Sequence, residues 1–145
     1  MEKITNNNIN EWISNGKSIF EYTLLKTAEN IISNERAIGF NEAIEIGIEK
    51  TITSLYIANI EDEQIRTISN KLWGISTKEI NERLNYIKVN MTIDSLKGYL
   101  KEQGYSKNKI IQMFRENQAA VKIRHDKKLW KLKDKPESLY KIFFN

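Results

Sequence analysis

Apolar residues recur every three to four positions through most of the chain, which is the spacing of a helix with one buried face. The pattern is clear over residues 17–34, from 41 to about 59, and again over 62–72. In the second of these segments Ile48 and Ile52 lie on the apolar stripe, whereas the glutamates fall on another face. The first half of the chain is therefore predicted to be a set of amphipathic helices.

Residues that favour helix ends set further boundaries. Ser76 and Glu79 match a capping box, in which the Ser76 hydroxyl accepts the Glu79 backbone N–H and the Glu79 carboxylate accepts the Ser76 N–H. A helix is predicted from Ser76 to about residue 90. Two more helices follow, one capped by Thr92 and closed by Gly104, and one capped by Ser106 and running to about residue 120.

Beyond residue 120 the apolar positions alternate with basic ones, which is typical of a strand with one buried face. Val121 and Ile123 alternate with lysine and arginine, and so do Trp130 and Leu132 after a polar turn at 125–128. This alternation predicts a small antiparallel β-hairpin.

The residue types needed for most catalytic and metal sites are scarce. The chain of 145 residues has no cysteine and a single histidine, His125, which excludes thiolate chemistry, disulfides and the usual zinc clusters. The run Asn15-Gly16-Lys17-Ser18 resembles the end of a phosphate-binding loop, but position 11, where that loop needs glycine, is Glu11. We therefore expect no enzyme activity, no metal and no cofactor.

No segment approaches the roughly 20 apolar residues of a membrane span, and the first residues lack the apolar core of a signal peptide. The protein is accordingly expected to be cytoplasmic, with no membrane partner. Isoleucine, asparagine and lysine are frequent, which indicates an A/T-rich coding genome such as that of a low-GC bacterium or one of its mobile elements.

Charge is distributed unevenly along the chain. Residues 1–90 carry 10 Lys/Arg against 13 Asp/Glu, whereas residues 91–145 carry 13 against 6. A basic surface of this kind favours a polyanion as partner. The sequence therefore predicts an acidic part, 1–90, for dimerisation or partner binding, and a basic part, 91–145, for nucleic acid, which together can form one domain.

Two segments resemble the helix-turn-helix pattern of DNA-binding proteins. In the first, Gly74 makes the turn and Ile80 and Leu84 fall at the buried positions of the second helix, although Trp73 adds one residue before the glycine. The second helix of this copy is not basic. In the other segment Leu96 and Leu100 precede Gly104, and buried positions follow at Ile110 and Met113.

The order helix, turn, helix, hairpin over about residues 92–133 is similar to that of the winged-helix family. The resemblance implies a mainly α fold, with a helical N-terminal part and a C-terminal winged-helix-like part ending in a small antiparallel β-hairpin. It also implies a regulatory protein of transcription, replication or partition that binds double-stranded DNA, as a homodimer on a two-fold site. The residues assigned to the major groove are Lys107, Lys109, Gln112 and Arg115, and those assigned to phosphates are Lys122, Arg124, Lys127, Lys128 and Lys131.

An alternative from a different class fits the same composition. A phage or mobile-element inhibitor, also non-enzymatic, would dock on a host nucleic-acid-processing protein or ribonucleoprotein. Its acidic N-terminal face would then mimic nucleic acid, while the basic part would touch nucleic acid bound to the host protein. The two hypotheses differ in whether free duplex DNA is bound.

Overall fold

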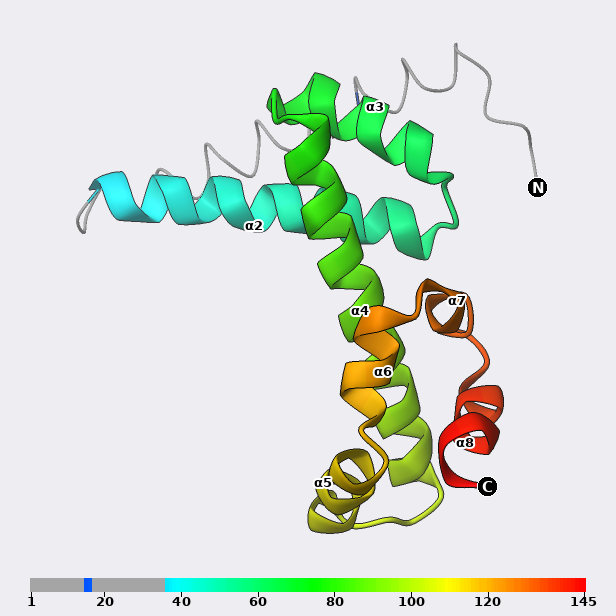
Figure 1. Ribbon diagram of the computed structural model, residues 1–145. Coiled ribbons are helices and arrows are strands. Elements are labelled where there is room, and N and C mark those ends of the chain that lie inside the picture. Colours follow the sequence, from blue (N-terminus) through cyan, green and yellow to red (C-terminus); the bar gives the residue numbers. More distant parts are fainter. Residues whose placement is uncertain (1–14, 17–35) are drawn as a thin grey trace. The chain divides into compact units, whose positions relative to one another are not determined.

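The computed structural model describes residues 15–16 and 36–145 and divides into two compact units, which meet in sequence between Leu84 and Asn85 (Figure 1). The helix predicted over residues 17–34 lies outside the described residues. From residue 36 onward the chain forms α2 (Arg36–Ile57), α3 (Asp62–Trp73), α4 (Thr77–Glu102), α5 (Lys107–Glu116), α6 (Ala119–His125), α7 (Lys127–Trp130) and α8 (Pro136–Phe144). None of the helices that the structure describes is long and apolar enough to cross a membrane.

The first unit contains α2, α3 and the start of α4. Helix α2 begins earlier than the predicted Asn41, and α3 begins at the predicted residue. Gly74 ends α3 with a left-handed backbone, φ 66°, a conformation that costs glycine little. The apolar stripes predicted from the sequence meet in the core of this unit, and the buried apolar side chains among its described residues are Ile48, Ile52, Leu55, Ile65, Ile68, Ile80 and Leu84.

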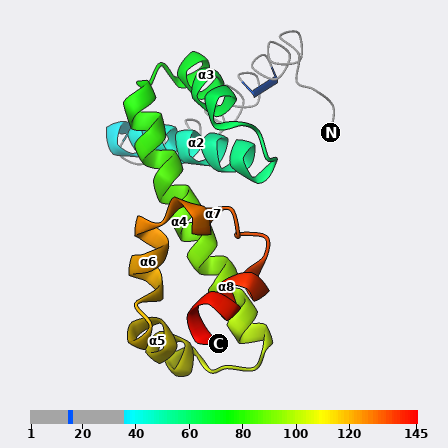
Figure 2. The ribbon, with the colours of Figure 1, turned by 45° about the vertical axis from the view of Figure 1, so that its right-hand side comes forward.

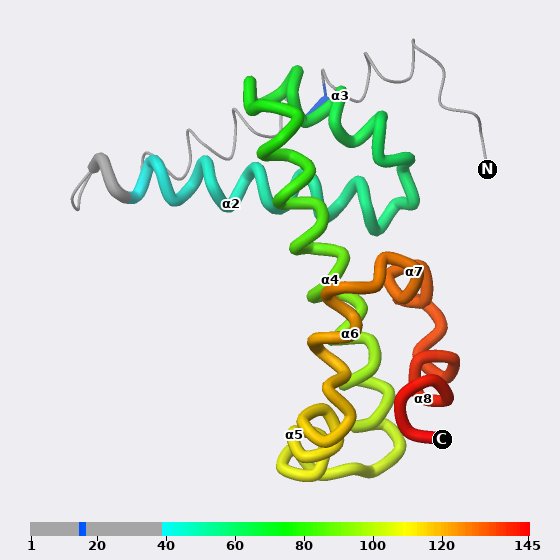
Figure 3. Tube along the Cα trace, viewed as in Figure 1, coloured from blue at the N-terminus to red at the C-terminus, as the bar shows by residue number. Residues whose placement is uncertain are grey.

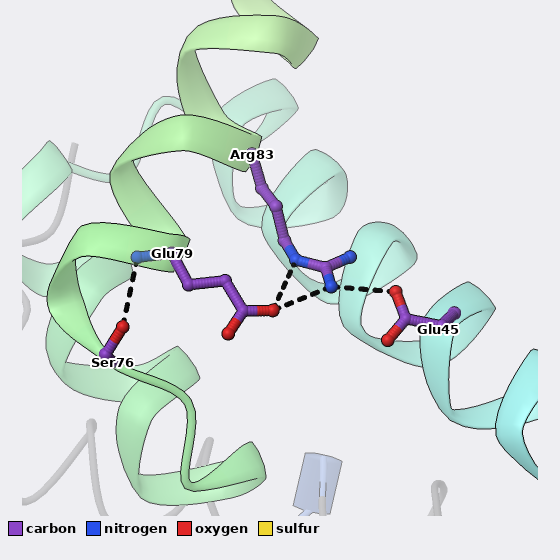
Figure 4. A network of polar contacts seen from close by, with 4 residues as sticks. All are labelled: Glu45, Ser76, Glu79 and Arg83. Atoms are coloured by element: carbon purple, nitrogen blue, oxygen red, sulfur yellow. Dashed lines mark hydrogen bonds and ion pairs between the residues drawn. The ribbon is translucent and has the colours of Figure 1, made fainter.

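The capping box at the start of α4 forms only in part (Figure 4). The Glu79 backbone N–H donates to the Ser76 hydroxyl at 3.2 Å, as predicted. The Glu79 carboxylate, however, accepts from Arg83 Nη2 at 2.8 Å, and the same nitrogen donates to Glu45 on α2 at 2.7 Å. The hydrogen bond to Glu79 raises the pKa of Arg83, so the guanidinium that joins α2 to α4 stays charged.

Helix α4 runs without a break through residues 90–92, where the sequence predicted one helix to end and another to begin. That prediction is wrong. Thr92 is fully buried, and its hydroxyl donates to the Lys88 carbonyl at 2.7 Å, one turn earlier, instead of capping a new helix. Val89 and Ile93 are buried on either side of it, so packing carries the helix through this point.

The second unit packs α5, α6, α7 and α8 around the later part of α4. In two views α6 runs alongside this part of α4 (Figures 1 and 2). Tyr140, on α8, stacks at a tilt against Tyr99 of α4 with ring centres 5.8 Å apart, and its hydroxyl lies 3.5 Å from that of Tyr105. The hydroxyl contact raises the pKa of Tyr140. The buried core of the unit comprises Val89, Ile93, Leu96, Leu100, Ile110, Met113, Phe114, Ala119, Ile123, Leu129, Trp130, Leu139 and Phe143.

The predicted β-hairpin is wrong, because residues 119–130 form α6 and α7 and the described part of the chain contains no strand. Ala119 and Ile123, four residues apart, are both fully buried, whereas Val121 is 51% exposed. The inward face therefore follows helical and not alternating spacing. The Asp126 carboxylate accepts the Lys128 backbone N–H at 2.9 Å and so caps α7, which places a helix start where the sequence predicted a turn (Figure 3).

Candidate nucleic-acid interface

All nine residues predicted to contact DNA are exposed, and all belong to three consecutive helices of the second unit or to their immediate end. Four lie on α5, two on α6, and three on α7 and the residue that ends it. They are, in that order, Lys107, Lys109, Gln112 and Arg115, then Lys122 and Arg124, then Lys127, Lys128 and Lys131.

Helix α5 exposes its polar residues because its apolar ones are fixed inward. Ser106 caps the helix by accepting the Lys109 backbone N–H at 3.2 Å, as the sequence predicted. Ile110, Met113 and Phe114 are buried, so the remaining positions face solvent. The register predicted for this helix is confirmed.

The Gln112 amide already has partners on its own helix. Its nitrogen donates to a Glu116 carboxylate oxygen at 2.7 Å, and its oxygen accepts from the Lys109 ammonium at 3.4 Å. The exposed face of α5 thus contains a carboxylate, Glu116, beside the residue that was predicted to read bases. The spacing of three and four residues permits both contacts, but the sequence analysis did not predict them.

Five cations are exposed within ten residues at the junction of α6 and α7. We call residues 122–131 the α6–α7 corner; its cations are Lys122, Arg124, Lys127, Lys128 and Lys131. The corner contains one acid, Asp126, whose carboxylate is engaged at the cap of α7. No carboxylate among the described residues lies within ion-pair distance of the five cations.

Trp130 ties the two helices of the corner together. Its indole N–H donates to the Ile123 carbonyl at 2.7 Å, and the bond is buried. The Lys127 ammonium lies 5.9 Å from the centre of the same ring, within the range of a cation–π contact. Sequence reasoning assigned Trp130 only to the core. A buried indole N–H usually needs a hydrogen-bond partner, and this general rule was the one signal in the sequence that Trp130 would also link two segments.

The electrostatic setting of these helices is strongly positive. Residues 85–145, the second unit, carry 14 Lys/Arg against 6 Asp/Glu, whereas residues 1–84 carry 9 against 13.

Lys133, which the alternating pattern placed outward, is instead largely covered and pairs with Asp134 at 2.6 Å. No group of His, Cys, Asp or Glu side chains in the described ranges is arranged to hold a metal ion.

Both glycine turns that prompted the helix-turn-helix resemblance join two helices as expected. Gly74 and Gly104 adopt left-handed backbones, with φ 66° and 88°. The predicted buried positions of the second segment, Leu100, Ile110 and Met113 among them, are buried.

Comparison with protein-family models, curated proteins and solved structures finds no match for the chain.

Proposed function

We propose that the protein is a non-enzymatic regulator that binds double-stranded DNA through α5, α6 and α7. The observation that supports this proposal is the exposure of all nine predicted contact residues on one unit. That unit has a surplus of eight positive charges. With no strand in the described part of the chain, the five cations predicted to contact phosphates lie on α6, on α7 and at the residue that ends α7. We therefore assign the phosphate contacts to the α6–α7 corner.

The physical basis of such binding is the release of counterions condensed on DNA. Each phosphate neutralised by Lys or Arg contributes about −0.9 to the slope of log K against log salt concentration. A surface that engages about six phosphates would thus give a slope near −5. Between roughly 50 and 200 mM salt, affinity should fall about a thousandfold.

The test is fluorescence anisotropy of a labelled mixed-sequence duplex of about 25 base pairs, titrated with the full chain across that salt range. We expect saturable binding with the steep slope just given. Circular dichroism at each salt concentration checks that the helices remain formed. A folded protein that does not bind the duplex even at the lowest salt concentration would overturn the proposal.

One feature of the first unit supports a second candidate, an inhibitor that docks on a host nucleic-acid-processing protein. On α2 the side chains of Phe40 and Ile46 are 45% and 53% exposed, close in sequence to the exposed carboxylate of Glu42. A shallow hollow of about 420 Å³ is lined by Asn41, Glu42, Glu45 and Ile46. Apolar and acidic groups together suit a basic protein surface. This candidate requires that free duplex is not bound.

A further inference from the structure

We propose that the α6–α7 corner binds the phosphate backbone of duplex DNA and does so without selecting base sequence. The inference rests on the proposed function and narrows it, because it names the part of the surface that holds the duplex and what that part recognises.

The first support is the chemistry of the corner. Its exposed donors are four ammonium groups and the guanidinium of Arg124, which match phosphate oxygens. No carboxylate of the described residues neutralises them, and Asp126 is engaged by the Lys128 backbone N–H. The cations are therefore available to phosphates.

The second support is that the corner is pre-formed. The buried bond from Trp130 to the Ile123 carbonyl links α7 to α6, and Leu129 is buried between the exposed lysines. The backbone that carries the cations is thus fixed before a ligand arrives. Binding then requires ordering of lysine and arginine side chains only, which keeps its entropic cost low.

The aromatic rings of these helices indicate which form of nucleic acid they suit. Proteins that hold single strands without sequence preference stack bases on exposed aromatic rings. On α5, α6 and α7 the phenyl and indole rings are those of Phe114 and Trp130, which are 8% and 7% exposed, and the exposed ring is the small imidazole of His125. Neither Phe114 nor Trp130 can serve as a stacking platform, and the single imidazole of His125 is not the series of rings on which successive bases stack. These helices therefore favour a duplex over a single strand.

The contacts of Gln112 indicate that the surface is poorly suited to reading bases. Bases are read in the major groove by side chains whose donors and acceptors are free to meet base edges. Gln112, the amide predicted for this task, is bonded through both of its polar atoms, to Lys109 and to Glu116. The Glu116 carboxylate would also approach the phosphates of any groove that α5 entered. We infer that contacts to phosphates dominate.

The experiment uses the full chain and three labelled probes: a mixed-sequence duplex of about 25 base pairs, a duplex of equal length and different base composition, and one strand of the first. Anisotropy should give duplex affinities within threefold of each other and weaker binding of the single strand. A tenfold preference between the duplexes, or tighter binding of the single strand, would overturn the inference.

Two matched variants locate the contact. Lys122→Gln/Arg124→Gln/Lys128→Gln removes three cations from the corner, and Lys101→Gln/Lys135→Gln/Lys141→Gln removes three exposed cations elsewhere in the same unit. The corner variant should flatten the salt slope by about three units, following the rule of about 0.9 per phosphate, and lower affinity more than tenfold. The control variant should change the slope by less than one unit.

The outcomes separate the inference from the function on which it rests. If both triple variants flatten the slope equally, the corner is not the contact and the inference fails, while DNA binding stands. If the unaltered protein binds none of the three probes, the proposed function itself fails. Circular dichroism of both variants shows whether the helices are retained. Should the corner variant unfold, the single substitutions Lys122→Gln and Lys128→Gln, each expected to cost about one unit of slope, replace it.

Discussion

Two tryptophans, one in each unit, donate a hydrogen bond from the indole N–H to another segment of the chain. The Trp130 indole N–H satisfies the carbonyl of Ile123, in the last turn of α6, where carbonyls lack a partner within the helix. In the first unit, the Trp73 indole N–H donates to the Thr51 hydroxyl at 3.1 Å. Each bond joins two segments, but only the first supports the α6–α7 corner.

Substitution of Trp130 should therefore affect both stability and DNA binding. Trp130→Phe should lower the free energy of unfolding by about 1–3 kcal/mol, because a buried carbonyl loses its partner. It should also weaken duplex binding, since the corner cations are then less firmly placed. Urea denaturation and duplex anisotropy measure the two effects.

Trp73→Phe is the matched control, because it removes a comparable donor from the first unit. It should cost about 0.5–1.5 kcal/mol of stability and leave duplex affinity unchanged. A merely structural role for Trp130 would make the two variants alike in DNA binding, and that result would contradict the prediction.

On α5 the sequence predicts the exposure of side chains more reliably than it predicts their partners. Ile110, Met113 and Phe114 have helical spacing, so the residues between them had to face solvent, and they do. The pairing of Gln112 with Glu116 depends on the conformations that two flexible side chains adopt. No periodic pattern encodes that choice, so part of the chemistry of the surface was out of reach.

In helix α4, tertiary packing overrides the local conformational preference of the sequence. Asn90 and Thr92 have low helix propensity and are common at caps, so the local sequence favoured a boundary. The helix continues because Val89, Ile93 and Leu96 are buried along one face. Their summed burial outweighs the propensity cost, which amounts to about 0.7 kcal/mol or less per residue.

The continuity of α4 can be tested at Asn90. Within an uninterrupted helix, Asn90→Gly should be less stable than Asn90→Ala by about 1 kcal/mol. At a boundary between two helices glycine is well tolerated, and the two variants would have the same stability. Comparison of their urea midpoints decides between the two, and equal midpoints would contradict a continuous helix.

The sequence analysis missed helices α6 and α7 for a different reason. Within a few residues, an alternating pattern and a helical pattern can be satisfied by the same apolar positions. The pair Ala119 and Ile123 fits the helix, and the pair Val121 and Ile123 fits the strand. Because alanine contributes little to a hydrophobic pattern, the pair Val121 and Ile123 determined the prediction of a strand. Burial of Ala119 and exposure of Val121 show which pair forms the inner face.

The unequal distribution of charge along the chain does not depend on the predicted β-hairpin, which was wrong. Solvent-exposed cations keep their electrostatic effect whether strands or helices carry them. The candidate residues therefore stay the same, although helices carry them and not a β-hairpin. The acidic first unit has no such surplus of cations, and the two units should respond to DNA differently.

Hydrogen exchange of the full chain can test this difference between the two units. A saturating duplex should slow amide exchange in α5, α6 and α7 because bound DNA stabilises the segments it touches. At a duplex concentration about 100 times the Kd, the stabilisation approaches about 2.7 kcal/mol, equivalent to roughly a hundredfold slowing where exchange requires opening of the bound segment. Exchange in α2 should remain unchanged, since its exposed acids repel phosphates.

The corner variant is the control, and it should lose the protection at equal DNA concentration. Protection centred on α2 by DNA would contradict the assignment of the interface. If DNA protects no segment and a nucleic-acid-processing protein protects α2, the inhibitor hypothesis replaces the regulator.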